Sequence, residues 1–317
     1  MTHTAFQFAI PRVPIGDFFT RLIDFLQRFF GWFFDGIKFL LAYMIEWVES
    51  LLKLSFIPSS ALGFMSEGLR DFVLAFIIIL TFVGLALLVV PTKKRKIILA
   101  TGTFLGLMLV YSMNLWAATM ETLSLVFVSS IMALTIGIPI GIFAARKANA
   151  NNVVIKPILD FMQTMPAFVY LLPAVALFSG GLSVRMISNV QGAVATIIFS
   201  MPPVVRLTTL GIQQVPKEVV EAAKSLGSSG KQLLFKVQLP VALPTIFAGI
   251  NQTIMLALSM VVIASMVGAR GLGYNVRFAL ARGISEIGSG FEAGLAVVII
   301  AIIIDRLTAS LAERAKI

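Results

Sequence analysis

The chain has 317 residues, of which 58% are hydrophobic and 13% charged, and its formal net charge is +10. A mean hydropathy of +0.97 with so little charge excludes an ordinary soluble domain. There is no cysteine and one histidine, His3, which excludes disulfides, thiolate metal sites and histidine-based catalysis. We therefore predict an all-α polytopic membrane protein with no metal site and no catalytic residue.

Residues 1–70 precede the first long apolar run and form a region of their own. Over residues 17–38, charged residues recur at helical spacing among phenylalanines, which predicts an amphipathic helix in the headgroup layer. The stretch Phe39–Leu54 carries three charges, each costing about 2.5–3.5 kcal/mol at the centre of a span. We interpret it as interfacial or packed on the bundle. The alternative is an eighth span, which would place the N-terminus inside.

Apolar stretches of about 20 residues, long enough to cross a bilayer core of about 30 Å, recur along the rest of the chain. They predict seven spans: Phe72–Pro91, Ile97–Ala117, Thr119–Ala145, Val153–Phe178, Ser188–Gly211, Val241–Val267 and Phe291–Leu311. Residues 71–118 are expected to form two peripheral helices. Residues 119–317 are expected to form the core, with a cytosolic loop at 213–240. No cleavable signal peptide is expected, because no basic segment precedes a short apolar run at the N-terminus.

Lysine and arginine set the predicted orientation, because these residues are retained on the cytoplasmic side of short loops. Most loop cations fall on one face of the seven predicted spans, and only Arg185, Arg270, Arg277 and Arg282 fall on the other. We therefore expect the N-terminus outside and the C-terminus in the cytoplasm. This topology and contact with anionic membrane lipids account for the net charge, so no nucleic-acid partner is expected.

The loop between the fifth and sixth predicted spans has the pattern of two short helices joined by a turn. Pro216 can begin the first helix, and Gly227 can end it in the left-handed conformation. Pro240 is expected to break the second helix before the next span. Ala222 and Ala223 leave one side of the first helix without bulk, which permits insertion into a groove on another protein. The alternative is an ordinary surface helix rich in Glu, Ala and Lys.

The loop reads Glu221-Ala222-Ala223, three residues, Gly227, nine residues, Val237, one residue, and Leu239-Pro240. This order resembles the EAA motif of importer permeases of the ATP-binding cassette (ABC) class, which usually have isoleucine where Val237 stands. The resemblance implies that the loop couples this chain to a separate ATPase. The implied coupling residues are Glu221, Ala222, Ala223, Ser225, Leu226, Gly227, Phe235, Lys236, Leu239 and Pro240.

A closer resemblance covers roughly residues 97–312. It is carried by Asp160–Tyr170, Phe199–Thr208, Phe235–Pro240, Asn251–Thr253, Met255–Met266 and Ile304–Thr308. These segments look like the permease subunit of glycine betaine/proline betaine importers, and choline, carnitine and trimethylamine-N-oxide importers use similar permeases. The resemblance implies the type I ABC importer permease fold in a prokaryotic cell membrane, with an external N-terminal tail before seven spans. The alternative is an importer permease for another small solute.

The same resemblance implies the partners: a second copy of this chain, two ATP-binding cassette ATPase subunits and an external solute-binding protein. The sequence has no glycine-rich phosphate loop ending in Lys-Ser or Lys-Thr, so ATP and Mg²⁺ are expected in the ATPase and no cofactor on this chain. ATP binding would drive the loops of two copies together and open the permease outward, and hydrolysis would reset it inward. Solute selectivity is expected to reside largely in the external receptor.

Polar uncharged residues within the spans are candidates for the translocation pathway, because they usually face a bundle interior. Aromatic rings in the fourth span can attract a quaternary ammonium by about 0.5–2 kcal/mol. The candidates are Gln163, Thr164, Pro166, Phe168, Tyr170, Gln191, Ser200, Met201, Asn251, Gln252 and Ser259. Four prolines are expected to break spans and free backbone carbonyls: Pro166, Pro173, Pro202 and Pro203. For each candidate, the alternative is that it only bridges or packs against neighbouring helices.

Asp160 and Asp305 fall near the cytoplasmic ends of the fourth and seventh predicted spans. We expect Asp160 to reach water or Lys156, and Asp305 to pair with Arg306 or a loop cation. An ion-coupled secondary carrier would need acidic groups nearer the midplane, which weighs against that alternative; a scaffold or channel is the other. The outer loop 268–290, rich in glycine and arginine, is either a dock for the binding protein or a solvated loop.

Overall fold

The computed structural model describes residues 15–55, 57, 66–90, 92–147 and 151–314, and these ranges contain helices and turns but no strand. The expectations for His3, for the other residues before position 15 and for Pro91 lie outside the described residues. The elements are α1 (Ile15–Leu52), α2 (Glu67–Val89), α3 (Lys93–Ser112), α4 (Trp116–Arg146), η2 (Asn151–Ile155), α6 (Lys156–Thr164), η3 (Ala167–Tyr170), α7 (Leu171–Leu177), α8 (Val184–Gln213), α9 (Lys217–Ser225), α10 (Gly230–Gln232), η4 (Leu233–Gln238), α11 (Leu239–Ala264), η5 (Ser265–Val267), α12 (Leu272–Arg282), η6 (Gly283–Glu286) and α13 (Ile287–Arg314). The all-α prediction is confirmed.

Six helical segments are long and apolar enough to cross a membrane, and one bent pair makes up to seven among the described residues. The six are Glu67–Val89, Lys93–Ser112, Trp116–Arg146, Val184–Gln213, Gly230–Val267 and Leu272–Arg314. This agrees with the prediction of about seven spans, although the helices begin earlier than the apolar stretches. The second predicted span is wrong at its end, because α3 stops at Ser112 and Asn114 turns the chain with φ of 57°.

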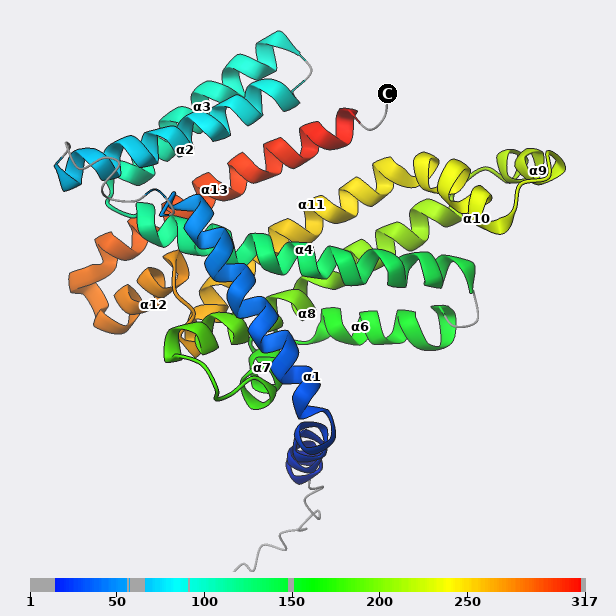
Figure 1. The fold of residues 1–317 in the computed structure, drawn as a ribbon, viewed down its shortest axis with the longest axis horizontal. Helices are drawn as coiled ribbons and strands as arrows, with labels where there is room; N and C mark the ends of the chain where they lie inside the picture. The colour runs from blue at the N-terminus through cyan, green and yellow to red at the C-terminus, as the bar shows by residue number, and fades with distance from the viewer. Residues whose placement is uncertain (1–14, 56, 58–65, 91, 148–150, 315–317) are drawn as a thin grey trace, which may run out of the picture.

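The fourth predicted span is broken into α6 and α7 (Figure 1), whose segments Val153–Thr164 and Ala167–Leu177 meet at 113°. The break falls at Pro166, as predicted, and Met165 before it is extended because a proline ring disfavours the helical conformation of the preceding residue. The predicted breaks at Pro173, Pro202 and Pro203 are wrong. Pro173 lies in the first turn of α7, where a missing N–H is tolerated.

The paired prolines of α8 lie inside a continuous helix. Pro202 and Pro203 are buried among neighbouring spans, and packing holds the helix together despite the missing donors. Close approach of α4 to α8 depends on glycine: a methyl group on Gly141 would lie 2.8 Å from the Val205 carbonyl oxygen. A methyl on Gly249 of α11 would lie 3.0 Å from the Leu207 Cβ. Small residues therefore let α4 and α11 pack on both sides of α8.

The hairpin of α2 and α3 lies at the edge of the bundle against α13 (Figure 1). Ile79 of α2, Leu107 of α3 and Ile303 of α13 form a small buried cluster there. A larger core cluster joins α4, α11, α12 and α13 around Met120 and Leu272. The hairpin is thus attached through one of its faces, and its other face is exposed.

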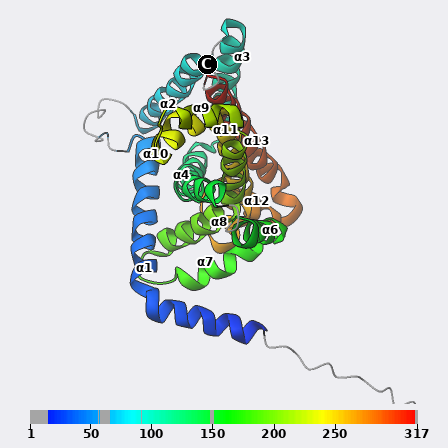
Figure 2. The same cartoon turned by 90° about the vertical axis from the view of Figure 1, so that its right-hand side faces the viewer.

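Helix α1 is one helix of 38 residues where two amphipathic stretches were predicted. Figure 1 shows it crossing the long helices at a steep angle, and Figure 2 shows its N-terminal part bent away from the rest. Leu41, Ile45 and Val48 are buried in a cluster shared with α4, α7 and α8. Helix α1 is not among the segments apolar enough to span, which favours packing on the bundle over an eighth span.

A network of ion pairs holds the end of α1 to the beginnings of α4 and α8. Glu49 accepts hydrogen bonds from Lys53 at 2.8 Å and from Arg185 at 2.5 Å. Glu121 of α4 lies 3.4 Å from the same two cations. Both carboxylates are mostly buried, with side chains 10% and 16% exposed, so each depends on these partners.

The segment interpreted as an outer loop is helical. Helix α12 packs against α13, with Leu272, Gly273 and Ala279 buried. Gly271, with φ of 108°, precedes it, and a methyl group on Gly273 would lie 2.3 Å from the Val261 carbonyl oxygen. The glycines that looked like loop residues therefore permit a turn and a close helix contact.

Candidate coupling loop and translocation cavity

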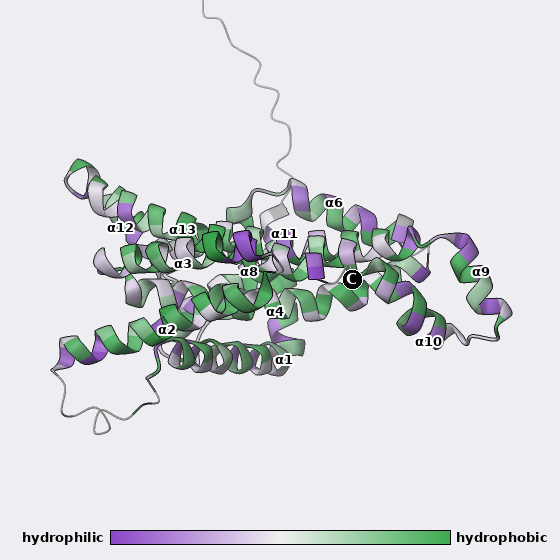
Figure 3. Ribbon diagram, turned by 90° about the horizontal axis from the view of Figure 1, so that it is seen from above, coloured by the Kyte–Doolittle hydropathy of each residue, from purple (hydrophilic) through white to green (hydrophobic). Residues whose placement is uncertain are grey.

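Helices α9 and α10 form an elbow that projects from one end of the molecule, and α12 lies at the opposite end (Figures 1 and 3). The elbow follows the end of α8 at Gln213 and returns to the bundle as α11. Pro216 caps α9 one residue before its first helical position, and α9 has no buried residue. Almost all of this helix is therefore available to a partner.

The end of α9 is fixed by Gly227, which has φ of 76° as the sequence predicts. The Gly227 N–H donates to the Lys224 carbonyl at 2.9 Å, and the Ser228 N–H donates to the Ala223 carbonyl at 3.2 Å. This pair of bonds is the Schellman arrangement, which satisfies carbonyls at a helix end and requires a left-handed residue. Glycine thereby sets the direction in which the chain leaves α9.

The second arm of the elbow begins with a capping box that the sequence interpretation missed. The Ser229 hydroxyl accepts from the Gln232 N–H at 3.3 Å, and the Gln232 side chain accepts from the Ser229 N–H at 2.8 Å. The order Ser-x-x-Gln was the available signal. The predicted break at Pro240 is wrong, because this proline lies in the first turn of α11 directly after the π turn of η4.

Two contacts fix the elbow to the bundle. Leu234 of η4 is buried in a cluster with Ile212 and Ile246 from the two spans that the loop connects. Arg146, at the end of α4, donates a hydrogen bond of 2.7 Å to the Gly230 carbonyl. The elbow is therefore attached to three spans: α4, α8 and α11.

Apolar side chains are exposed on the elbow, at 41% for Val219, 87% for Leu226 and 65% for Phe235. Val219, Ala222 and Leu226 lie on one face of α9 by their spacing of three and four residues. Of the other implied coupling residues, Glu221, Ser225, Lys236 and Pro240 are exposed, and Ala223 and Leu239 are partly buried. An exposed apolar face on an otherwise polar element indicates a protein contact.

Beneath the elbow, a polar cavity of about 710 Å³ opens between α6, α8 and α11. Gln163 and Gln252 line it, with Lys156 and Arg206 as its cationic residues. Gln163 and Gln252 are thus the two pathway candidates that lie on this cavity. Asn151, Thr209 and Gln213 add polar lining that the sequence interpretation missed, since polar residues near span ends look like ordinary loop boundaries.

The other pathway candidates do not gather around one cavity. Tyr170 is 4% exposed, its hydroxyl donates to the Met162 carbonyl, and its ring packs on Phe199 at 5.9 Å. Phe168 is 57% exposed, and Ser200 is fully buried. Of the rest, Thr164, Pro166 and Ser259 are exposed, and Met201 is partly buried. Gln191 is buried, and its amide donates to the Phe178 carbonyl at 3.3 Å.

Asn251 joins α11 to α13. Its side-chain amide donates to Asp305 at 2.9 Å, and its carbonyl accepts from the Thr308 hydroxyl. Arg306 lies 3.9 Å from the Asp305 carboxylate, a long version of the predicted pair. Asp160 is paired with Arg206 of α8, whereas water or Lys156 was the expected partner. The packing of α6 on α8 brings the guanidinium of Arg206, a planar fork of donors, close to this carboxylate.

The family described as the binding-protein-dependent transport system inner membrane component matches residues 137–317, which include the elbow and the polar cavity. The chain belongs to this family. The permease is 46% identical to the glycine betaine/carnitine transport permease protein GbuB of Listeria monocytogenes, over 97% of this chain and 98% of that protein. It is 44% identical to the glycine betaine transport system permease protein OpuAB of Bacillus subtilis, over 97% of each.

Other relatives of the permease include the glycine betaine/proline betaine permease protein ProW of Escherichia coli, 40% identical over 93% of this chain and 74% of that protein. The fold is also that of a chain in the inward-facing MetNI methionine ABC transporter. That match has a TM-score of 0.54 at 21% identity, over 63% of this chain and 95% of the other. The permease is thus a multi-pass membrane subunit of an ABC transport system with the type I permease fold.

Proposed function

We propose that this permease carries a compatible solute or quaternary amine of the glycine betaine class across the cell membrane by alternating access. The observation that carries the proposal is the similarity to GbuB and OpuAB, at 46% and 44% identity over 97% of this chain. The names of both proteins state glycine betaine transport. Trimethylamine N-oxide permeases match a shorter part, at 39% identity over 68% of this chain. Glycine betaine, proline betaine, choline and trimethylamine N-oxide belong to one proposed substrate class.

The proposed motor is a pair of ATP-binding cassette ATPase subunits that bind ATP and Mg²⁺. The elbow supports this assignment, because Leu226 and Phe235 are exposed apolar side chains on an element attached to three spans. A homodimer of the permease and an external solute-binding protein complete the proposed assembly. The polar cavity would lie on the path of the solute, with Gln163 and Gln252 contributing uncharged polar groups.

The proposed orientation places the elbow and the C-terminus in the cytoplasm, with α12 outside. Residues 1–70 would form the external and interfacial region, residues 71–118 the peripheral hairpin, and residues 119–317 the core. The exposed aromatic residues of α1 support an interfacial position, with Phe18 at 68% and Trp32 at 75% exposed. Arg277 of α12 is partly buried, whereas Arg282 is 56% exposed and its only ion pair among the described residues is a long one of 3.7 Å to Glu286, so Arg282 can pair with an acid on a binding protein.

An ion-coupled carrier is a weaker alternative. It requires acidic groups free to exchange a proton or sodium ion, whereas Asp160 is paired with Arg206 and Asp305 bonds to Asn251. Uptake by such a carrier would fall with an ion uncoupler and persist after ATP depletion. The proposed importer predicts the reverse dependence.

The test is reconstitution of the permease with its ATPase and its binding protein in liposomes. We expect glycine betaine with its receptor to stimulate ATP hydrolysis several-fold and to accumulate inside the liposomes. Proline betaine, choline and trimethylamine N-oxide are compared at equal concentration. ATP hydrolysis that no member of this class stimulates, in a complex that another small solute does stimulate, would overturn the proposed substrate.

A further inference from the structure

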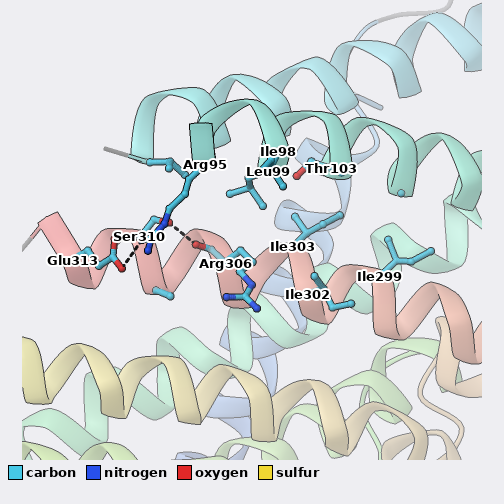
Figure 4. A pocket seen from close by; sticks show the side chains of 14 residues that line it. Arg95, Ile98, Leu99, Thr103, Ile299, Ile302, Ile303, Arg306, Ser310 and Glu313 are labelled. Atoms are coloured by element: carbon cyan, nitrogen blue, oxygen red, sulfur yellow. Dashed lines mark hydrogen bonds and ion pairs between the residues drawn. The ribbon is translucent and has the colours of Figure 1, made fainter. Parts of the chain in front are cut away.

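A second cavity, of about 650 Å³, lies between the peripheral hairpin and α13 (Figure 4). Its lining comes from α3 and α13, with Val90 at the end of α2, and it shares no residue with the elbow or with the polar cavity. The walls are mostly apolar, with Leu99 and Ile303 inside. Ile98 and Ile302 are 68% and 55% exposed, so the opening faces outward from the bundle. In a membrane this side meets lipid.

Glycine shapes the cavity. A methyl group added to Gly102 would meet no atom within 4 Å, so this position opens the space between the helices. One turn further along α3, a methyl on Gly106 would lie 2.8 Å from Ile299, where the helices close together. Thr103 is fully buried on the lining, and its hydroxyl has no hydrogen-bond partner among the described residues. The result is a slot closed at one end.

The open end carries two arginines and one carboxylate. Arg95, Arg306 and Glu313 line it, with side chains 67%, 68% and 47% exposed. One nitrogen of Arg95 contacts both oxygens of Glu313, at 3.1 and 3.2 Å, which leaves its other donors available. The guanidinium of Arg306 makes only the long contact of 3.9 Å to Asp305 within the described part of the chain. Lys93 and Lys94 add positive charge to the first turn of α3.

We propose that this cavity binds an anionic phospholipid, with the phosphate at Arg95 and Arg306 and one acyl chain in the slot. Arginine matches phosphate oxygens with a planar fork of donors, and basic pockets between spans suit anionic headgroups. A zwitterionic lipid brings an ammonium group that the cluster of cations repels. The lipid would fill the gap between the hairpin and α13, adding contacts where the hairpin has few of its own.

The proposal is tested by native mass spectrometry of the full-length permease in mild detergent, titrated with dioleoylphosphatidylglycerol or dioleoylphosphatidylcholine. We expect the wild type to retain phosphatidylglycerol at least tenfold more tightly. The double variant R95Q/R306Q should bind both lipids equally. The control K93Q/K94Q removes the same charge from residues outside the cavity lining and should keep the preference.

A second variant tests the slot without changing charge. Gly102→Leu places a side chain in open space, so the fold should persist, and we expect a several-fold loss of phosphatidylglycerol retention. Equal retention of both lipids by the wild type, or an unchanged preference in R95Q/R306Q, would overturn the proposal. So would wild-type retention in Gly102→Leu. Displacement of the lipid by millimolar inorganic phosphate would also contradict it, since the site would then recognise phosphate without an acyl chain.

Discussion

At the residue scale, Gly227 decides how the elbow turns. A β-branched residue at a φ of 76° costs about 1–3 kcal/mol of backbone strain. A side chain there would meet no atom within 4 Å, so the backbone alone is perturbed. We expect the complex that contains Gly227→Val to hydrolyse ATP but to move roughly tenfold less solute per ATP. The reason is that the strain makes the elbow conformation with the left-handed residue 227 the minor one. Uptake and hydrolysis are measured together in liposomes.

Asparagine is the matched control at this position, because it tolerates the left-handed conformation better than other side chains. We expect Gly227→Asn to retain most coupled uptake. Equal uptake in the valine variant and the wild type, at equal protein levels, would count against the role given to the helix end.

Features that depend on neighbouring residues in the sequence were predictable, and contacts between distant residues were not. The cap at Gly227 was predictable, because a local pattern alone determines it. The partner of Asp160 was not, since Arg206 lies 46 residues away and only the packing of α6 on α8 joins them. Asn251 similarly pairs across 54 residues with Asp305. Among the pathway candidates, only Gln163 and Gln252 lie on the polar cavity, because the type of a residue indicates its polarity but not the direction in which its side chain points.

At the element scale, α4 and α8 depend on a contact that only glycine permits. A Cβ on Gly141 would approach the Thr208 Cβ to 2.7 Å. We expect Gly141→Leu to destabilise the protein by about 1–3 kcal/mol through overpacking. Thermal unfolding of the purified permease measures the effect.

The control is Gly84→Leu on α2, where an added side chain has open space. It should unfold within a few degrees of the wild type. A similar loss of stability in both variants would mean that glycine-to-leucine changes act generally and not through the α4–α8 contact.

Elements were predictable where one local signal dominated. Long apolar stretches predicted the spans, and Pro166 predicted the break between α6 and α7. The same rule failed at Pro202 and Pro203, where tertiary packing keeps α8 continuous. Helix α12 was missed because Gly271 and Gly273 resemble loop residues until the contact with Val261 is known.

At the scale of the whole molecule, the proposed topology places the elbow and α12 on opposite sides of the membrane. The absence of cysteine makes single-cysteine labelling free of background. Ser225 and Ser285 are both exposed, one on each of these ends. We expect a membrane-impermeant maleimide to label Ser285→Cys in intact cells and Ser225→Cys only after the cells are opened. Labelling of Ser225→Cys in intact cells would reverse the topology.

The central claim is that the elbow docks on an ATPase that this chain does not contain. A photo-crosslinking residue at Leu226, 87% exposed, tests it in cells, with Ile284, 89% exposed at the opposite end, as the matched control. We expect an adduct between position 226 and an ATP-binding cassette subunit, and none from position 284. An adduct with that subunit from position 284 and not from position 226 would contradict it.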